Sequence, residues 1–273
     1  GFEIGVVKAM RAVAWLQHRT LRRGLETVQQ NAAGDVFLDN PGRSGPFTGT
    51  SALRDTTTLA FEVLLAPAPK LSFRATYLWG RAVGTWTGPF DPRQGATLYT
   101  GTEWDLDATN LYGRLPTDAG HRFAVEGERR GRVGPVELAV STRLTVSSGR
   151  PRNVLADSDL GVIHLLPRGS GGRMPTLSQA NVRLAARWRR LDFTLDAFNV
   201  FDREETVTAG EIYGDGTPPI VGGTLDDLVF AKSELCGELG ACTARPVTRR
   251  STFGLPTSFQ NPLSVVLGVH HAF

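Results

Sequence analysis

The feature that most constrains this chain is a repeated pairing of alternating apolar and polar stretches across very short turns. Residues 181–188 and 191–201, for example, are separated only by Arg189-Arg190. Successive side chains of a β-strand point to opposite faces, so this alternation predicts strands with one apolar face. Two such stretches joined by so short a turn predict an antiparallel hairpin.

The same pattern recurs along the whole chain and predicts about nine strands, eight of them in four hairpins. The expected strands are residues 2–8, 12–22, 59–65, 71–80, 121–130, 136–146, 181–188, 191–201 and 263–273. Between the hairpins lie long polar connections, at about 24–58, 81–120, 147–180 and 202–262. Loops of this length are uncommon inside a compact soluble domain, whereas a membrane barrel combines short turns at one end with long loops at the other. We therefore expect an all-β fold: the carboxy-terminal portion of an antiparallel up-and-down transmembrane β-barrel.

One register of the hairpin around Arg189-Arg190 gives both faces a consistent character. One face is apolar and pairs Trp188 with Leu191, Ala186 with Phe193 and Leu184 with Leu195. The other face pairs opposite charges, Arg187 with Asp192 and Arg183 with Asp196. A register that fits on both faces is strongly specified. The second hairpin, turning at residues 66–70, is expected to set Leu65 opposite Leu71 and Val63 opposite Phe73, with Glu62 next to Arg74.

Alternation alone does not distinguish a soluble sandwich from a barrel. In a barrel the apolar face meets lipid, and we expect Trp79, Trp188, Phe193 and Phe273 on the outer surface. The charged face would then line the lumen as a polar wall, formed by Glu62, Arg74, Arg183, Arg187, Asp192 and Asp196. Such a wall serves either as a surface against which a plug or a solute moves, or as the hydrated, self-neutralising lining that any wide barrel needs.

Composition narrows the class of protein further. No run approaches the roughly 20 apolar residues of a spanning helix. The 30 Lys and Arg residues against 27 Asp and Glu residues form no basic block, so nucleic acid is not expected as a partner. The histidines are scattered without a nucleophile motif, and His270 and His271 point to opposite faces of a strand. We expect no enzyme activity, no cofactor and no metal site.

The last expected strand ends the sequence on an aromatic residue. Gly268 and Phe273 match the assembly signal of bacterial outer-membrane proteins, a glycine followed by aromatics three and five residues later, with His271 in place of the first aromatic. If the short turns are periplasmic, the ninth strand descends and the first strand enters from outside. A closed bacterial barrel has an even number of strands, so at least one strand must precede residue 1. Residues 1–273 are therefore expected to be the carboxy-terminal part of a barrel domain, without its plug and amino-terminal strands.

Several short motifs, in order along most of the chain, resemble the TonB-dependent outer-membrane receptors. They resemble in particular the Oar-like group, whose amino-terminal extension is similar to a carboxypeptidase regulatory domain. The motifs are Asn40-Pro41-Gly42, residues 70–79, Tyr112-Gly113-Arg114-Leu115-Pro116-Thr117-Asp118, Ser148-Gly149-Arg150-Pro151, residues 167–175, Phe198-Asn199-Val200-Phe201-Asp202 and residues 254–262. The motif after the eighth strand, residues 198–202, is the most specific of them.

This resemblance implies a barrel of about 22 strands filled by a plug domain. It implies active uptake of a scarce, bulky solute across the outer membrane of a Gram-negative bacterium, driven by the inner-membrane TonB complex. The implied partners are outer-membrane lipid, the upstream plug and strands of the same receptor, and the barrel assembly machinery. Family members handle siderophores, cobalamin, carbohydrates and peptides, so the substrate stays open.

Two other classes compete with this interpretation. The chain could be a self-contained outer-membrane enzyme or porin-like barrel, or a soluble all-β binding module. The coding sequence upstream of residue 1 discriminates between them. A plug-like domain and an export signal would support the receptor, and a nearby start codon the small barrel. A start without an export signal would support the soluble module.

The two cysteines, Cys236 and Cys242, lie in the longest connection. That connection joins an ascending to a descending strand and would lie outside the cell, where no glutathione pool reduces thiols. We therefore expect a disulfide between them, stiffening a loop at the barrel entrance. Two free thiols remain the alternative.

Overall fold

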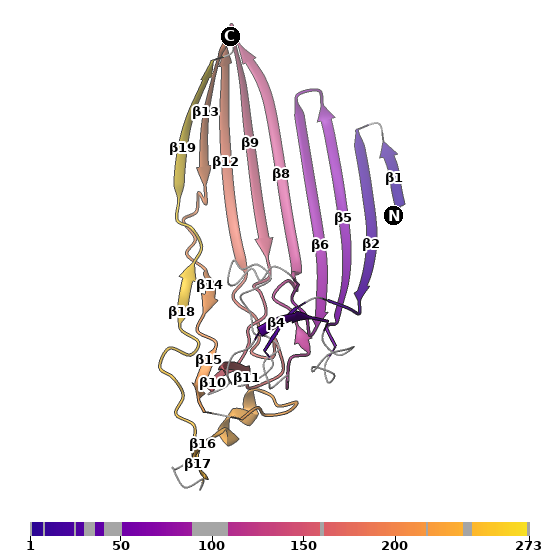
Figure 1. Cartoon of the computed structure of the whole chain (residues 1–273). Helices are drawn as coiled ribbons and strands as arrows, with labels where there is room; N and C mark the ends of the chain where they lie inside the picture. The colour runs from indigo at the N-terminus through magenta and orange to yellow at the C-terminus, as the bar shows by residue number, and fades with distance from the viewer. Residues whose placement is uncertain are drawn as a thin grey trace.

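One large sheet runs through the whole chain (Figure 1). The computed structural model describes residues 2–7, 9–24, 26–29, 36–40, 51–88, 109–158, 161–216, 218–236 and 242–271. Nine long strands lie side by side in chain order, each antiparallel to its neighbours. They are β1 (Phe2–Val7), β2 (Met10–Leu21), β5 (Arg54–Ala68), β6 (Leu71–Gly84), β8 (Gly120–Val133), β9 (Val136–Ser147), β12 (Leu177–Trp188), β13 (Leu191–Phe198) and β19 (Ser264–His271). The expected antiparallel up-and-down fold is confirmed.

The hairpin of β12 and β13 has the register that its sequence predicts. Trp188 pairs with Leu191, and every pair onward to Val182 with Ala197 follows without a shift. The turn is Arg189-Arg190, and Arg189 has a φ of 55°. Two-residue hairpin turns require positive φ because their twist must match that of the strands.

The register expected for the hairpin of β5 and β6 is wrong by two residues. Leu65 pairs with Phe73 instead of Leu71, and Val63 pairs with Ala75 instead of Phe73. The cause is an irregularity between Leu65 and Ala68 that lets β5 continue to Ala68, opposite Leu71. Pro67 lies in this irregularity and has no N–H to donate, which suits a break in the ladder.

Two of the turns are therefore shorter than the sequence indicates. Pro69-Lys70 and Gly134-Pro135 each form a two-residue turn, where connections of 66–70 and 131–135 were expected. Gly134 has a φ of 57°, which glycine adopts without a steric penalty. The strands extend correspondingly further, so β8 ends only at Val133.

The long connections contain small sheets that alternation in the sequence does not predict. Their elements are β3 (Glu26–Gln29), β4 (Val36–Asp39), β7 (Gly113–Arg114), β10 (Leu155–Ser158), β11 (Gly161–His164), β14 (Thr206–Ala209), β15 (Ile212–Asp215), η1 (Leu225–Phe230), β16 (Lys232–Cys236), β17 (Cys242–Pro246) and β18 (Pro256–Phe259). β10 pairs antiparallel with β11 and parallel with β15. Most of these elements gather at the end of the large sheet opposite the short turns (Figure 1).

The apolar core lies among these connections, not in the large sheet. It consists of Val154, Ala156, Ile163, Leu165 and Leu166, all nearly or fully buried. Tyr213, Ile220, Leu228 and Phe253 pack against it. We call this body the loop layer; it is built from the described residues within 109–119, 148–176 and 206–262.

Candidate functional site: the polar wall of the large sheet

The two faces of the large sheet differ in chemistry over most of their extent. Leu59, Trp79 and His121 stand opposite one another in one row, and Phe61, Tyr77 and Phe123 in the next. The same face carries Leu184, Leu195 and Leu267 at its other end. The opposite face carries the charged pairs described below, with a few apolar side chains such as Trp15 and Leu78 among them, and we call it the polar wall.

The apolar face is open to its surroundings. Trp188 is 42% exposed and Phe193 41% exposed, as expected for the outer surface of a barrel. Trp79 is only half-buried, between Leu59 and His121, and Phe273 lies outside the described residues. In the described part of the chain, no second sheet packs over these side chains, which a soluble sandwich would require.

A chain of alternating charges crosses four strands of the polar wall. The Arg74 guanidinium lies 2.6 Å from the Glu62 carboxylate. Glu126 stands opposite Arg74 in the register, and Arg143 lies 3.4 Å from Glu126. The order is therefore acid, base, acid, base from β5 to β9. Glu62 reaches Arg74 diagonally, because the shifted register places it opposite Thr76.

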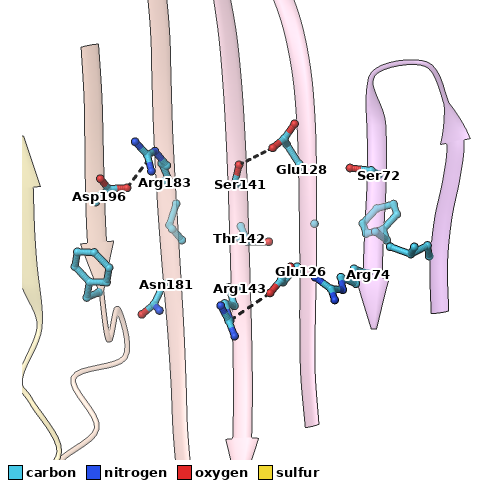
Figure 2. Close-up of a pocket in the computed structure, with 15 residues that line it drawn as sticks. Ser72, Arg74, Glu126, Glu128, Ser141, Thr142, Arg143, Asn181, Arg183 and Asp196 are labelled. Carbon is cyan, nitrogen blue, oxygen red and sulfur yellow. Dashed lines mark hydrogen bonds and ion pairs between the residues drawn. The ribbon is translucent and has the colours of Figure 1, made fainter. Parts of the chain in front are cut away.

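The same alternation continues toward the short turns. Arg183 lies 3.4 Å from Asp196, and Arg187 lies 2.6 Å from Asp192. Figure 2 shows three of these cross-strand interactions: Arg183 with Asp196, Ser141 with Glu128, and Arg143 with Glu126. These side chains line a hollow that extends over six strands, from β5 to β13.

The wall brings together all six of the charged residues that the sequence assigns to one face. It adds Glu126, Glu128 and Arg143, which sequence reasoning missed. Within the expected strands 121–130 and 136–146 these charged residues alternate with apolar ones, so the alternation could have found them. Exposed ion pairs of this kind each contribute about 0–1 kcal/mol, so these pairs add little to the stability of the sheet. No cluster of three or more metal-ligating side chains occurs in the described part of the chain.

Partly and fully buried polar groups hold the loop layer together. Asn110 donates from Nδ2 to the carbonyl oxygens of Leu165 (3.1 Å) and Ile220 (3.0 Å), joining three connections. Asp118, only 3% exposed, lies 2.8 Å from the guanidinium of Arg173. Buried polar groups are costly unless paired, so these contacts specify one arrangement of the loops.

Two charged groups in the loop layer, Arg250 and Asp227, have pKa values shifted from their ordinary ones. Arg250 contacts Asp215 and Asp157, and these hydrogen bonds, chiefly that to Asp215, raise the pKa of the Arg250 guanidinium. Asp227 accepts hydrogen bonds from the backbone N–H and the hydroxyl of Thr224, and these bonds lower the pKa of the Asp227 carboxyl. Asp227 thereby caps η1.

The motif at residues 198–202 acts as a clamp on the last strand. Asn199 is 1% exposed, has a φ of 52°, and donates from Nδ2 to the carbonyl of Asn261 at 2.8 Å. Its Oδ1 and Nδ2 also bond the backbone of Arg203. Asp202 accepts from the backbone N–H of Leu263 at 2.8 Å. The motif thus fixes where the chain enters β19.

The remaining expected sites stay predictions. Cys236 and Cys242 stand directly opposite each other in the β16–β17 pair, and their side chains lie outside the described residues. Of the assembly signal, Gly268 faces Thr194, whose hydroxyl would lie 2.5 Å from an added Cβ. His271 pairs with Leu191 at the end of β19.

Comparison with known proteins gives one relative along the full chain. The TonB-dependent transporter Oar of Myxococcus xanthus is 27% identical over 298 aligned positions, which cover 100% of this chain and 27% of that protein. This chain thus spans about a quarter of its relative's length. No family model matches the sequence. The described residues include no helix long and apolar enough to cross a membrane.

A solved structure, the outer membrane transporter YddB from Escherichia coli, aligns with 92% of this chain and 30% of its own. The TM-score is 0.49 and the sequence identity 11%. Independently of this structure, the resemblance to TonB-dependent receptors found in the sequence motifs is supported by the similarity to Oar, which extends over the whole of this chain.

Proposed function

We propose that residues 1–273 are the carboxy-terminal part of the outer-membrane β-barrel of a TonB-dependent active-transport receptor. The observation that carries this proposal is the coincidence of two features. The chain is similar to a TonB-dependent transporter over its whole length, and it folds as a sheet with one apolar and one polar face. The polar wall would line the lumen, and the apolar face would contact lipid.

The open edges of the sheet support a larger barrel. In the described strands, β1 and β19 each have a neighbour on one side only. Unpaired backbone groups are very costly in lipid, so both edges need further strands. Upstream strands of the same receptor would close the barrel, and an upstream plug would fill it and reach the TonB complex.

The loop layer would form part of the extracellular surface that first meets the solute. Its buried core and shared hydrogen bonds support a preorganised shape, which lowers the entropic cost of binding. A disulfide between Cys236 and Cys242 would add to this rigidity. Residues directly opposite in an antiparallel pair have Cα atoms about 4.5–5.5 Å apart, a separation that a disulfide spans.

A catalytic or porin-like role has less support. Six of the wall's charged residues form ion pairs across the strands, and no nucleophile, base and acid grouping distinguishes a reaction centre in the described residues. A soluble binding module would need to cover the apolar face that is open here.

The test is energised uptake by the full-length protein in its native outer membrane. We expect the protein in the outer-membrane fraction, and loss of solute-dependent growth both on its deletion and on deletion of the TonB complex. Growth that needs the protein but not the TonB complex would indicate a passive barrel instead. Recovery of the protein only in the soluble fraction would contradict the proposal.

A further inference from the structure

A second hollow lies on the apolar face of the sheet, at the ends of β2, β5 and β6 that are opposite the short turns. Its lining is polar except for one apolar residue, Val83; the polar residues are His18, Thr20, Arg22, Asp55, Thr57 and Arg81. The His18 ring bonds Thr57 at 3.0 Å and Thr20 at 3.1 Å. In the register Thr57 stands opposite both His18 and Arg81, so these side chains share one face.

The position of this hollow relative to the apolar band is fixed by the register. One row nearer the short turns lies Leu16–Leu59–Trp79, on the same face. Two residues along a strand span about 7 Å, so the hollow begins directly beyond the aromatic edge of the apolar band. Aromatic side chains gather at membrane–water interfaces, which puts the hollow at the depth of lipid headgroups.

Of the two arginines that line the hollow, only Arg22 has an acidic partner in the described part of the chain. Arg22 lies 3.5 Å from Asp55. Arg81 is exposed, and no acidic side chain in the described part of the chain pairs with it. The hydroxyls of Thr20 and Thr57 and the His18 ring add hydrogen-bonding groups around it. A cation at this depth, surrounded by polar donors and bordered by apolar surface, matches a phosphate group attached to acyl chains.

We propose that this hollow binds the phosphate of a lipid headgroup in the membrane leaflet at the loop-layer end, with Arg81 and Arg22 as its cationic ligands. The site rests on the proposed membrane placement of the sheet. The lipid is favoured over free phosphate because its chains would cover the apolar row of Leu16, Leu59 and Trp79 directly beside the site.

The sheet offers a matched control for the decisive variant. Arg129 lies on the same face, opposite Leu71 and Val140, at the short-turn end. Arg81→Glu and Arg129→Glu therefore make the same charge change on the same face at opposite membrane edges. Neither residue belongs to the polar wall, so both variants should assemble normally.

The experiment titrates delipidated full-length protein in a neutral detergent with bisphosphorylated lipid A and counts bound lipid by native mass spectrometry. Reversing one headgroup-level charge should weaken binding about tenfold in Arg81→Glu, with little change in Arg129→Glu. Dephosphorylated lipid A should bind to the wild type as weakly as bisphosphorylated lipid A binds to Arg81→Glu. Inorganic phosphate at equal concentration should not compete.

Equal binding to the wild type and Arg81→Glu, or an equal loss in Arg129→Glu, would overturn the site. Efficient competition by inorganic phosphate would show a free-anion site instead and contradict the lipid assignment. Membrane fractionation of the cells that express these proteins distinguishes failure of this site from failure of the proposed function. Wild-type protein absent from the outer membrane would refute the proposed function and this site together. Correct insertion without dependence on Arg81 would refute the site alone.

Discussion

The large sheet and the loop layer are stabilised in different ways. Within the nine long strands, the described apolar residues that are buried are all alanines: Ala60, Ala82 and Ala124. The large buried side chains, such as Leu165 and Leu166, belong to the connections. The sheet therefore relies on its backbone ladder and leaves both of its faces open. The loop layer has its own small core, like a folded domain.

The largest expected contrast comes from removing the same side chain in each region. Leu165→Ala should destabilise the loop layer by about 4 kcal/mol, because it leaves a cavity among fully buried neighbours. Leu184→Ala on the apolar face should cost about 1 kcal/mol or less, because fluid lipid or detergent fills the gap. Amide hydrogen exchange of each region in the full-length protein measures both effects. Similar losses in the two variants would mean that the regions do not differ in this way.

The next effect concerns the clamp that joins the two regions. Asn199→Gly keeps the positive φ but removes the side-chain hydrogen bonds to Arg203 and Asn261, a loss of about 3 kcal/mol at roughly 1 kcal/mol each. Exchange should rise at the start of β19 while β8 stays protected. Val200→Ala, at an exposed neighbouring position, is the control. Unchanged protection of residues 261–266 in Asn199→Gly would show that the clamp is dispensable.

A smaller effect is expected at the predicted disulfide. Loss of a short-loop bridge by Cys236→Ser should cost about 2 kcal/mol locally by the chain-entropy estimate. Proteolysis should therefore increase between β16 and β17 but not in the large sheet. Reductant should reproduce the effect in the wild type and leave Cys236→Ser unchanged. Alkylation of both thiols without reductant would refute the bridge.

Ion pairs on the polar wall should contribute less to stability than the predicted disulfide does. A double-mutant cycle on Arg183 and Asp196 should give a coupling below about 1 kcal/mol, since both side chains contact water. The cycle is read from thermal unfolding of the full-length protein. A coupling of several kcal/mol would mean that the wall is desolvated, as it would be under a tightly packed plug.

The smallest effect is a pH dependence confined to η1. The lowered pKa of Asp227 means that its capping contribution is present above the ordinary pKa of a carboxyl and is lost as pH falls through the lower folded value. Amide exchange of residues 225–230, corrected for intrinsic rates, should quicken on acidification. In Asp227→Asn it should show little pH dependence, and Asp226→Asn should behave as the wild type.

The strands of the large sheet could be predicted because the features that specify them involve residues close together in the sequence. Alternation and short turns located all nine strands, and opposite charges such as Arg187 and Asp192 set the β12–β13 register. The register at Pro67 was wrong because an irregularity depends on ladder geometry that no pattern of apolar residues encodes. The loop layer escaped prediction because its contacts are distant in sequence. Asn110 and Ile220, for example, are joined across 110 positions.

The central claim is that one face of the sheet contacts lipid and the other an aqueous lumen. Spin labels placed one at a time at positions 183 to 188 of β12, in full-length protein reconstituted in bilayers, test it directly. Labels at 184, 186 and 188 should be accessible to oxygen, which concentrates in lipid, and labels at 183, 185 and 187 to a water-soluble paramagnetic reagent. Alternation with a period of two supports the claim. Uniform access of the water-soluble reagent to both sets of positions would contradict it.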